Sequence, residues 1–184
     1  MERLEQTGKK YTINGQKIFA RKKTNNKWFE TQDAINYWDD FSKQKIAYAE
    51  TMRVHRNIDA DRFPRFSFVE EDYYHDKTCF IMTGNNLRYI NAVINSSLMN
   101  YFIHKNIAVL DTGGFLMQKI YVEQFPIPNA TPEIRENLSQ LQQEVIKLRR
   151  DGKDSSTTER EIDNCVYTLF GLSTDEIIYI EENM

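Results

Sequence analysis

Hydrophobic and polar residues alternate over short distances in the first part of the chain. Tyr11-Thr12-Ile13 and the run 16–20 flank Asn14-Gly15, and this dipeptide between two such runs is a strong signal for a two-residue β-hairpin. Residues 45–51, 66–69 and 78–82 are short apolar runs bounded by polar stretches, which is typical of strands. The pattern therefore predicts short strands and turns as far as residue 82.

The spacing changes to that of a helix after residue 82. Asn85 or Asn86 is suited to cap a helix, which we expect to end near Asn106. Apolar residues recur in it every three or four positions, at Leu87, Ile90, Val93 or Ile94, Leu98 and Tyr101. Farther along, paired glycines predict a turn within residues 111–114. Prolines predict an extended strand over residues 125–128, because a residue before proline avoids the helical region.

A second helical pattern occupies the C-terminal part of the chain. The sequence Thr-Pro-Glu at 131–133 is typical of a helix start. Polar residues 151–157 predict a hinge. Residues 159–170 predict a second helix that ends at Gly171. Ser173 with Glu176 predicts the capping box of a last short helix. A heptad seam precedes the hinge, at Ile134, Leu138, Leu141, Val145 and Leu148. The tail is thus predicted to be a helical hairpin. The seam is either an oligomer interface or, as we slightly favour, the packing face of that hairpin.

Charge is distributed unevenly along the 184 residues, whose formal net charge is -3. Residues 1–65 hold 14 basic and 9 acidic side chains, a net of +5, and residues 66–184 hold 10 and 18, a net of -8. A DNA contact surface joined to a protein contact surface has this distribution, and so does an ordinary solvated surface with uneven charge. Composition alone leaves the two interpretations about even.

The remaining bulk features predict a cytoplasmic protein. A hydrophobic share of 40% is enough for a packed core. No apolar run approaches the roughly 18 residues that a membrane span requires, and the polar start of the chain is unlike a secretory signal. Cys79 and Cys165 stand far apart, without the spacing of a zinc site or a disulfide framework. We therefore expect no membrane association and a reducing compartment.

Catalytic motifs are missing from the sequence. The four prolines, Pro64, Pro126, Pro128 and Pro132, are never adjacent and no G-x-G occurs, so the base-clamping and methyl-donor motifs of an amino-methyltransferase are absent. The three histidines are scattered, which favours neither a triad nor a metal cluster. A small nuclease using Asp151 and Lys153 is a distant third hypothesis, since this pair falls in the hinge. We expect no catalytic site, no bound cofactor and no metal in this chain.

Two basic, polar loops carry side chains suited to DNA. Arginine pairs with guanine, asparagine with adenine and lysine with phosphate. The alternative is a pair of solvated loops. A weaker third candidate is the glycine-containing loop that ends with a glutamine and a lysine. The candidate DNA-binding residues are Arg21, Lys22, Lys23, Asn25, Asn26, Lys27, Arg53, His55, Arg56, Arg62, Arg65, Gln118 and Lys119.

Aromatic residues cluster near the start of this region and have two interpretations. They would stack on nucleic-acid bases or pack in the core, and the core interpretation is favoured. The residues are Trp28, Tyr37, Trp38, Phe41 and Tyr48.

Several of these blocks, taken in order, resemble a known family. They are the aromatic run from Trp28 to Trp38, Asn95-Ser96-Ser97-Leu98, Gly113-Gly114 and Phe125-Pro126-Ile127-Pro128, followed by the C-terminal pattern from Ile162 to Ile177. Over residues 28–128 the chain resembles the TaqI-type C-terminal specificity domain of type IIG restriction-modification enzymes and adenine-specific DNA methyltransferases. The resemblance implies an α+β fold, with an irregular β-rich, β-helix-like recognition domain at 1–128 and an α-helical hairpin module at 129–184.

The resemblance also implies a function. Domains of this kind bind double-stranded DNA and select the target for an adenine-specific methyltransferase, often with a nuclease, in the same or a partner chain. S-adenosylmethionine belongs to that partner domain alone. Members of the family carry the catalytic domain first, so this chain corresponds to an excised domain, a split-gene fragment or a free specificity subunit. We expect a DNA target recognition domain of a restriction-modification or related phage-defence system. The alternative is a derived protein-interaction module that forms a homodimer through its helical tail.

Overall fold

The computed structural model describes residues 10–19, 36–52, 65–70, 72–75, 78–111 and 114–183. The chain divides into two compact units, Met1–Asp39 and Asp40–Met184. The described parts consist of helices and separate small antiparallel sheets, which confirms the predicted α+β class. The functional division predicted at residue 128 stays a prediction.

A β-hairpin is the described element of the first unit. Strands β1 (Lys10–Ile13) and β2 (Gln16–Phe19) pair antiparallel, with Ile13 opposite Gln16. Asn14 and Gly15 between them have positive φ angles of 50° and 78°, as a type I′ turn requires at both central positions. The predicted hairpin is therefore confirmed.

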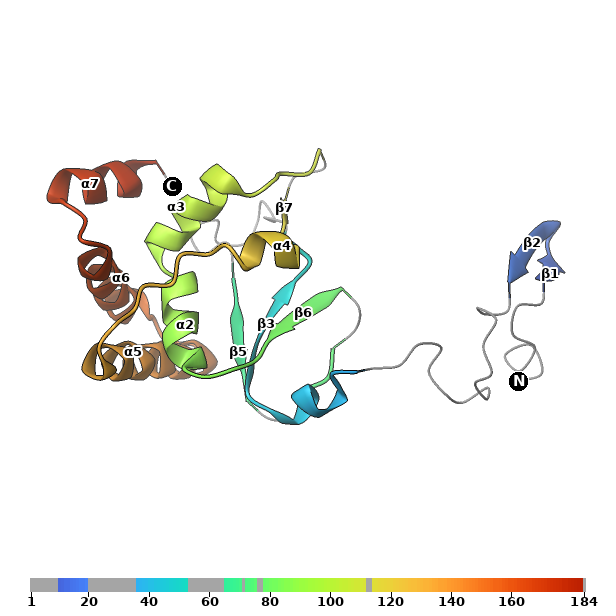
Figure 1. Cartoon of the computed structure of the whole chain (residues 1–184), viewed down its shortest axis with the longest axis horizontal. Helices are drawn as coiled ribbons and strands as arrows, with labels where there is room; N and C mark the ends of the chain where they lie inside the picture. The colour runs from blue at the N-terminus through green and yellow to red at the C-terminus, as the bar shows by residue number, and fades with distance from the viewer. Residues whose placement is uncertain are drawn as a thin grey trace. The chain divides into compact units, whose positions relative to one another are not determined.

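A three-stranded antiparallel sheet, in the order β5-β3-β6, forms one layer of the second unit (Figure 1). Strand β3 (Lys45–Ala49) pairs with β5 (Ser67–Val69) on one side and with β6 (Cys79–Met82) on the other. All three strands fall within runs that the hydrophobic pattern predicted. Ile46 and Tyr48 of β3 are buried, so one face of the central strand packs into the core.

The predicted strand 45–51 does not remain in one sheet. After β3 the chain forms β4 (Thr51–Met52), which pairs with β7 (Phe115–Leu116) in a separate two-stranded ladder. Glu50 makes the change: its N–H donates to the carbonyl of Thr78 at 2.9 Å, and its own carbonyl accepts from the N–H of Met117 at 2.8 Å. Through these two backbone hydrogen bonds Glu50 contacts the segments beside β6 and β7, so the chain passes from one sheet to the next at this residue.

The helix predicted between Asn86 and Asn106 is two helices, so the prediction of one helix was wrong. Helix α2 (Leu87–Ile94) ends before Ser96, and α3 (Ser97–Asn106) begins after it. The Ser96 hydroxyl donates to the carbonyl of Val93 at 2.7 Å and accepts from the N–H of Met99 at 3.3 Å. A serine that bonds the backbone in this way competes with the helical ladder and caps a new helix.

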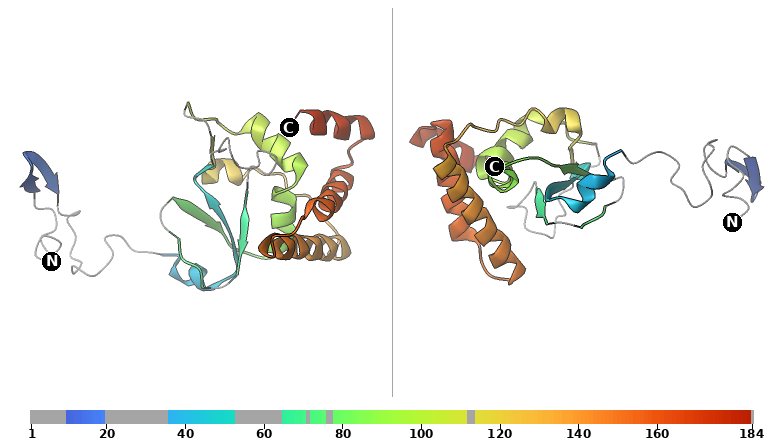
Figure 2. Two further views of the ribbon diagram at one scale, coloured as in Figure 1. Left: turned by 180° about the vertical axis from the view of Figure 1, so that it is seen from behind. Right: turned by 60° about the horizontal axis from the view of Figure 1, so that its bottom comes forward.

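Three helices make up the C-terminal part, α5 (Pro132–Arg150), α6 (Ser156–Phe170) and α7 (Thr174–Glu182). The predicted start of α5 after Thr131, Gly171 in the left-handed region at the end of α6 and both bonds of the Ser173–Glu176 capping box are confirmed. Helix α6 begins at Ser156, three residues before the predicted start and within the predicted hinge. Both views in Figure 2 show α2 and α3 between the sheet and these helices. The second unit is therefore layered, with sheet, α2–α3 and α5–α7 in succession.

Residues 125–128, predicted as an extended strand, pair with no other segment among the described residues. Pro126 and Pro128 have no N–H to donate to a ladder. The segment instead packs Phe125 into the core and accepts a bond at the Pro128 carbonyl from the Tyr89 hydroxyl.

One hydrophobic core joins the sheet to the helices, and its buried residues come from β3, β4, β7, α2, α3, α5 and α6 and from the segments that connect them. Two seam residues of α5, Leu138 and Val145, are 0% and 3% exposed, and Ile134 and Leu141 pack against the same core. The heptad seam thus contacts this chain's own core, in agreement with the favoured packing interpretation. A homodimer through the tail stays a prediction.

A buried amide network connects the three layers. The Asn91 side chain of α2, fully buried, donates to the carbonyl of Phe66 at 2.8 Å and accepts from Nε2 of Gln142 on α5 at 2.6 Å. Asn95 also donates to the Phe66 carbonyl and accepts from the Phe66 N–H, both at 2.9 Å. The residue that enters β5 is therefore fixed to α2, and α2 is fixed to α5.

A partly buried carboxylate links α6 to the start of α3. Asp163 accepts from both the N–H and the hydroxyl of Ser97, each at 2.7 Å. Burial raises the pKa of the Asp163 carboxyl, although the two bonds from Ser97 act in the opposite direction. Burial, together with the adjacent Asp163 carboxylate, raises the pKa of Tyr167 to about 12. Asp163 of α6 thus satisfies a backbone N–H in the first turn of α3. This contact costs the carboxylate part of its hydration.

Candidate nucleic-acid interface

Most of the DNA-binding residues predicted from the sequence lie outside the described residues. These are Arg21, Lys22, Lys23, Asn25, Asn26, Lys27, Arg53, His55, Arg56 and Arg62. Three remain. Arg65 is exposed directly before Phe66, and Gln118 and Lys119 are exposed at the start of α4 (Lys119–Val122). Lys119 pairs with Glu123 at 3.2 Å.

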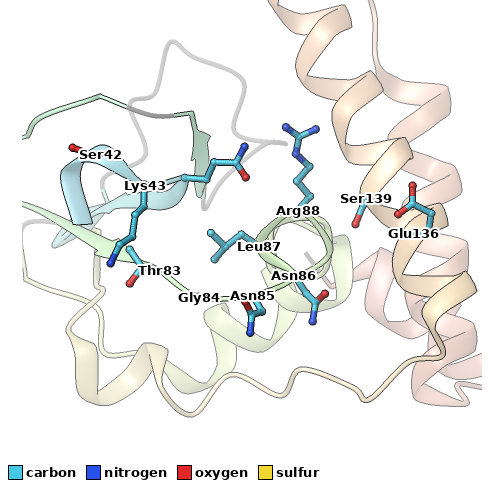
Figure 3. Close-up of a pocket in the computed structure, with 11 residues that line it drawn as sticks. Ser42, Lys43, Thr83, Gly84, Asn85, Asn86, Leu87, Arg88, Glu136 and Ser139 are labelled. Carbon is cyan, nitrogen blue, oxygen red and sulfur yellow. The ribbon is translucent and has the colours of Figure 1, made fainter. Parts of the chain in front are cut away.

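A polar cleft in the second unit gathers side chains that the sequence interpretation did not select. Its volume is about 830 Å³, and its walls come from the turn before β3, the turn between β6 and α2, and one face of α5 (Figure 3). The lining residues are Ser42, Lys43, Gln44, Thr83, Gly84, Asn85, Asn86, Leu87, Arg88, Glu136 and Ser139.

The first wall is held by a buried lysine. Lys45, at the start of β3, is 1% exposed, and its ammonium donates to the carbonyls of Phe41 at 2.8 Å and Lys43 at 2.6 Å. These carbonyls belong to the end of the 3-10 helix η1 (Trp38–Ser42) and the turn that follows it. A buried ammonium needs such partners, so Lys45 fixes the turn that presents Lys43 and Gln44 to the cleft.

The second wall is the amino end of α2. Asn86, its N-cap residue, is left-handed with a φ of 56° and makes no side-chain capping bond. The first backbone N–H groups of a helix have no partner within the helix, and the helix dipole makes this end partially positive. Asn85, Asn86 and Leu87 line the cleft, so this end of α2 faces it.

Charged and amide groups around the cleft bond to one another. Lys43 pairs with Asp40 at 2.7 Å and keeps 61% of its side chain exposed. Arg88 pairs with Glu70 at 3.0 Å, and its guanidinium carbon lies 4.8 Å from the centre of the Phe68 ring. The Gln44 amide donates to the other oxygen of Glu70, also at 3.0 Å. The two cations and the amide are thus oriented by neighbouring groups.

The chemistry of this cleft suits a nucleic acid. Amide side chains both donate and accept hydrogen bonds, and they can pair bidentately with adenine. Guanidinium and ammonium groups bind guanine edges and phosphate. Gln44, Asn85 and Asn86 supply the amides, and Lys43 and Arg88 the cations. Glu136 and the adjacent Glu70 add negative charge, so the cleft is polar without being uniformly basic.

The aromatic residues divide between core and surface. Phe41 and Tyr48 are 5% and 6% exposed, which confirms the favoured core interpretation for them. Tyr37 and Trp38 are 50% and 56% exposed, so the core interpretation was wrong for this pair. Trp28 lies outside the described residues. Aromatic content alone did not distinguish the residues that face the core from those beside them.

A second, apolar groove of about 550 Å³ lies between α5 and α6. Ile134, Cys165 and Leu169 contribute its apolar lining, and Asn137 of α5 contacts the Cys165 sulfur at 3.7 Å. Burial raises the pKa of the Cys165 thiol, which keeps it protonated and weakly nucleophilic at neutral pH. This groove is a candidate protein contact.

The pair Asp151 and Lys153 forms an exposed contact of 3.4 Å in the turn after α5. Within the described ranges, no group of three or more histidine, cysteine, aspartate or glutamate side chains is arranged to hold a metal ion. None of the described helices is long and apolar enough to cross a membrane. No protein-family model and no curated protein matches this chain.

Proposed function

We propose that this chain is a DNA target recognition domain that serves an adenine-specific DNA methyltransferase in a restriction-modification or related phage-defence system. The observation that carries the proposal is the polar cleft at the amino end of α2. It gathers three amide side chains and two cations around a volume of about 830 Å³. The resemblance of residues 28–128 to TaqI-type specificity domains supports the same conclusion.

The cleft residues have distinct roles in this proposal. Lys43 binds a phosphate and fixes the register of the duplex, whereas Asn85, Asn86 and Gln44 contact base edges. Arg88, held beside Phe68 and Glu70, offers a planar donor pair to guanine. The basic residues predicted from the sequence at 21–27 and 53–65 are further proposed contacts to DNA.

The catalytic step belongs to a separate domain. A methyltransferase acting on adenine takes the base out of the helix and transfers the methyl group of S-adenosylmethionine to it. In this proposal the recognition part, with its irregular β-helix-like strands, holds the duplex, and the α5–α6 helical hairpin contacts the catalytic partner. The 12 acidic and 6 basic side chains of residues 129–184 disfavour DNA and favour a protein contact for this part.

The test is a titration of the full chain with duplex DNA at several salt concentrations. Replacement of both cleft cations, in Lys43→Ala/Arg88→Ala, removes two positive charges from the cleft. Loss of Lys43, the proposed phosphate contact, should lower the slope of log affinity against log salt by about one, and loss of Arg88, the proposed guanine contact, should lower affinity for the target sequence. Lys147→Ala/Arg150→Ala removes the same charge from exposed positions in the last turn of α5 and should leave the slope unchanged. Equal effects of both double variants would contradict the role of the cleft.

A protein-interaction module is the second candidate function, and the apolar groove between α5 and α6 favours it. A chain of this kind would show no DNA binding even at low salt, and a self-association that salt does not change. Sedimentation velocity at two salt concentrations distinguishes the two functions. Ile134→Glu, which places a charge in the groove, should abolish association only in the second case.

A further inference from the structure

Glu70 stands directly after β5 and contacts two residues of the polar cleft at once. One carboxylate oxygen accepts from the Arg88 guanidinium at 3.0 Å, and the other accepts from the Gln44 amide at 3.0 Å. Arg88 follows Glu70 by 18 positions and Gln44 precedes it by 26. A single carboxylate therefore joins two walls of the cleft.

The Arg88 guanidinium is held from two directions. Glu70 accepts from one of its nitrogens, and the Phe68 ring lies 4.8 Å from its central carbon. The Arg88 side chain is only 27% exposed, against 54% for Glu70. A planar donor held in this way loses less freedom when it binds a partner. A partly exposed ion pair of this kind contributes little to folding stability.

A carboxylate beside a DNA-binding cleft also weakens binding to every duplex, because it repels the phosphates. Its position next to Arg88 and Gln44 fits a residue that improves discrimination at the expense of affinity. Glu136, which lines the same cleft from α5 and accepts from Gln140 at 2.8 Å, adds the same charge. No described contact joins Glu136 to Arg88 or Gln44.

We propose that Glu70 is a specificity-determining positioning residue, which orients Arg88 and Gln44 toward the bases of bound DNA. The inference rests on the proposed function of the cleft. In Glu70→Gln one oxygen becomes an NH₂ group, so at most one of the two donors keeps its acceptor. The negative charge disappears as well. Affinity for random duplex should therefore rise a few-fold, while preference for the target over random sequence falls by roughly tenfold or more.

The experiment selects duplexes from a randomised pool with the full chain as wild type, Glu70→Gln, Glu136→Gln and Arg88→Lys. Glu136→Gln is the matched control, because it removes the same charge from the same cleft and its remaining oxygen can still accept from Gln140. Both glutamine variants should bind the unselected pool more tightly than wild type. Glu70→Gln alone of the two should give a broader enriched motif. Arg88→Lys keeps the charge but loses the planar donor pair, and it should broaden the motif without a gain in affinity.

The outcomes separate this inference from the function on which it rests. An enriched motif that is equally sharp for wild type, Glu70→Gln and Arg88→Lys would overturn the role of Glu70 and leave target recognition intact. If Glu136→Gln also gave a broader motif, the broadening would be due to charge alone, and this result would also overturn the role of Glu70. Absence of any enriched motif with the wild type would overturn the proposed function, and the role of Glu70 with it.

Discussion

Asn91→Ala should strongly destabilise the second unit, because the Asn91 amide is the buried link between β5, α2 and α5. The substitution leaves the Gln142 amide, in a side chain that is 5% exposed, without its partner at 2.6 Å. An orphaned buried donor costs about 1–3 kcal/mol. The lost bond to the Phe66 carbonyl adds about 1 kcal/mol, since Asn95 still donates to that oxygen. The expected loss of unfolding free energy is therefore about 3 kcal/mol.

Urea unfolding followed by circular dichroism measures this loss. With an m-value of about 2 kcal/mol per molar, the midpoint should fall by roughly 1.5 M while m stays constant. Asn106→Ala is the control. Asn106 is exposed and makes one bond, to the Phe102 carbonyl, so its replacement should change stability by no more than about 0.5 kcal/mol.

The double variant Asn91→Leu/Gln142→Leu tests whether the loss of stability comes from an unpaired buried group. It removes donor and acceptor together and leaves neither orphaned, which is far less costly than the removal of one partner. The loss of unfolding free energy in the double variant should therefore be smaller than the sum of the losses in Asn91→Leu and Gln142→Leu. Additive single effects, or a loss below about 0.5 kcal/mol for Asn91→Ala, would refute the account of this network.

Three further predictions concern local features of the helices. Ser173→Ala removes the capping-box hydroxyl of α7 and should cost about 1 kcal/mol in urea unfolding. Gly171→Ala places a β-carbon at a φ of 66° and should cost about 1–2 kcal/mol, with a smaller loss for Gly171→Asn. Burial raises the pKa of Asp163 above its ordinary value of 3.8, so the folded protein takes up this proton at a higher pH than the unfolded chain. The stability of wild type relative to Asp163→Asn should therefore increase as the pH falls from 7 toward 4. A difference that is constant with pH, or that decreases on acidification, would contradict this prediction.

Local signals in the sequence were sufficient for much of the fold. Asn14-Gly15 specifies a hairpin turn because both residues tolerate positive φ. Ser173 and Glu176 specify a helix start because their side chains satisfy backbone N–H groups within four residues. Such features depend only on neighbours along the chain, and they were predicted correctly.

Features that depend on distant contacts were not predictable in the same way. Ser96 divides the predicted helix because its hydroxyl donates to the Val93 carbonyl and accepts from the Met99 N–H. In the sequence alone, a serine within a helical pattern is compatible with an unbroken helix. Arg88 and Gln44 meet at Glu70 only after the sheet and α2 have packed. The asparagines at 85 and 86 were interpreted as helix caps alone. The sequence interpretation, which selected clusters of basic residues, therefore missed the cleft.

Recognition of a DNA sequence is the function proposed for this chain. The most direct test is the selection of bound duplexes from a randomised pool by the wild-type chain at two salt concentrations. We expect enrichment of a short motif that contains adenine, with binding that weakens steeply as salt rises. Failure to bind duplex DNA even at low salt would contradict it.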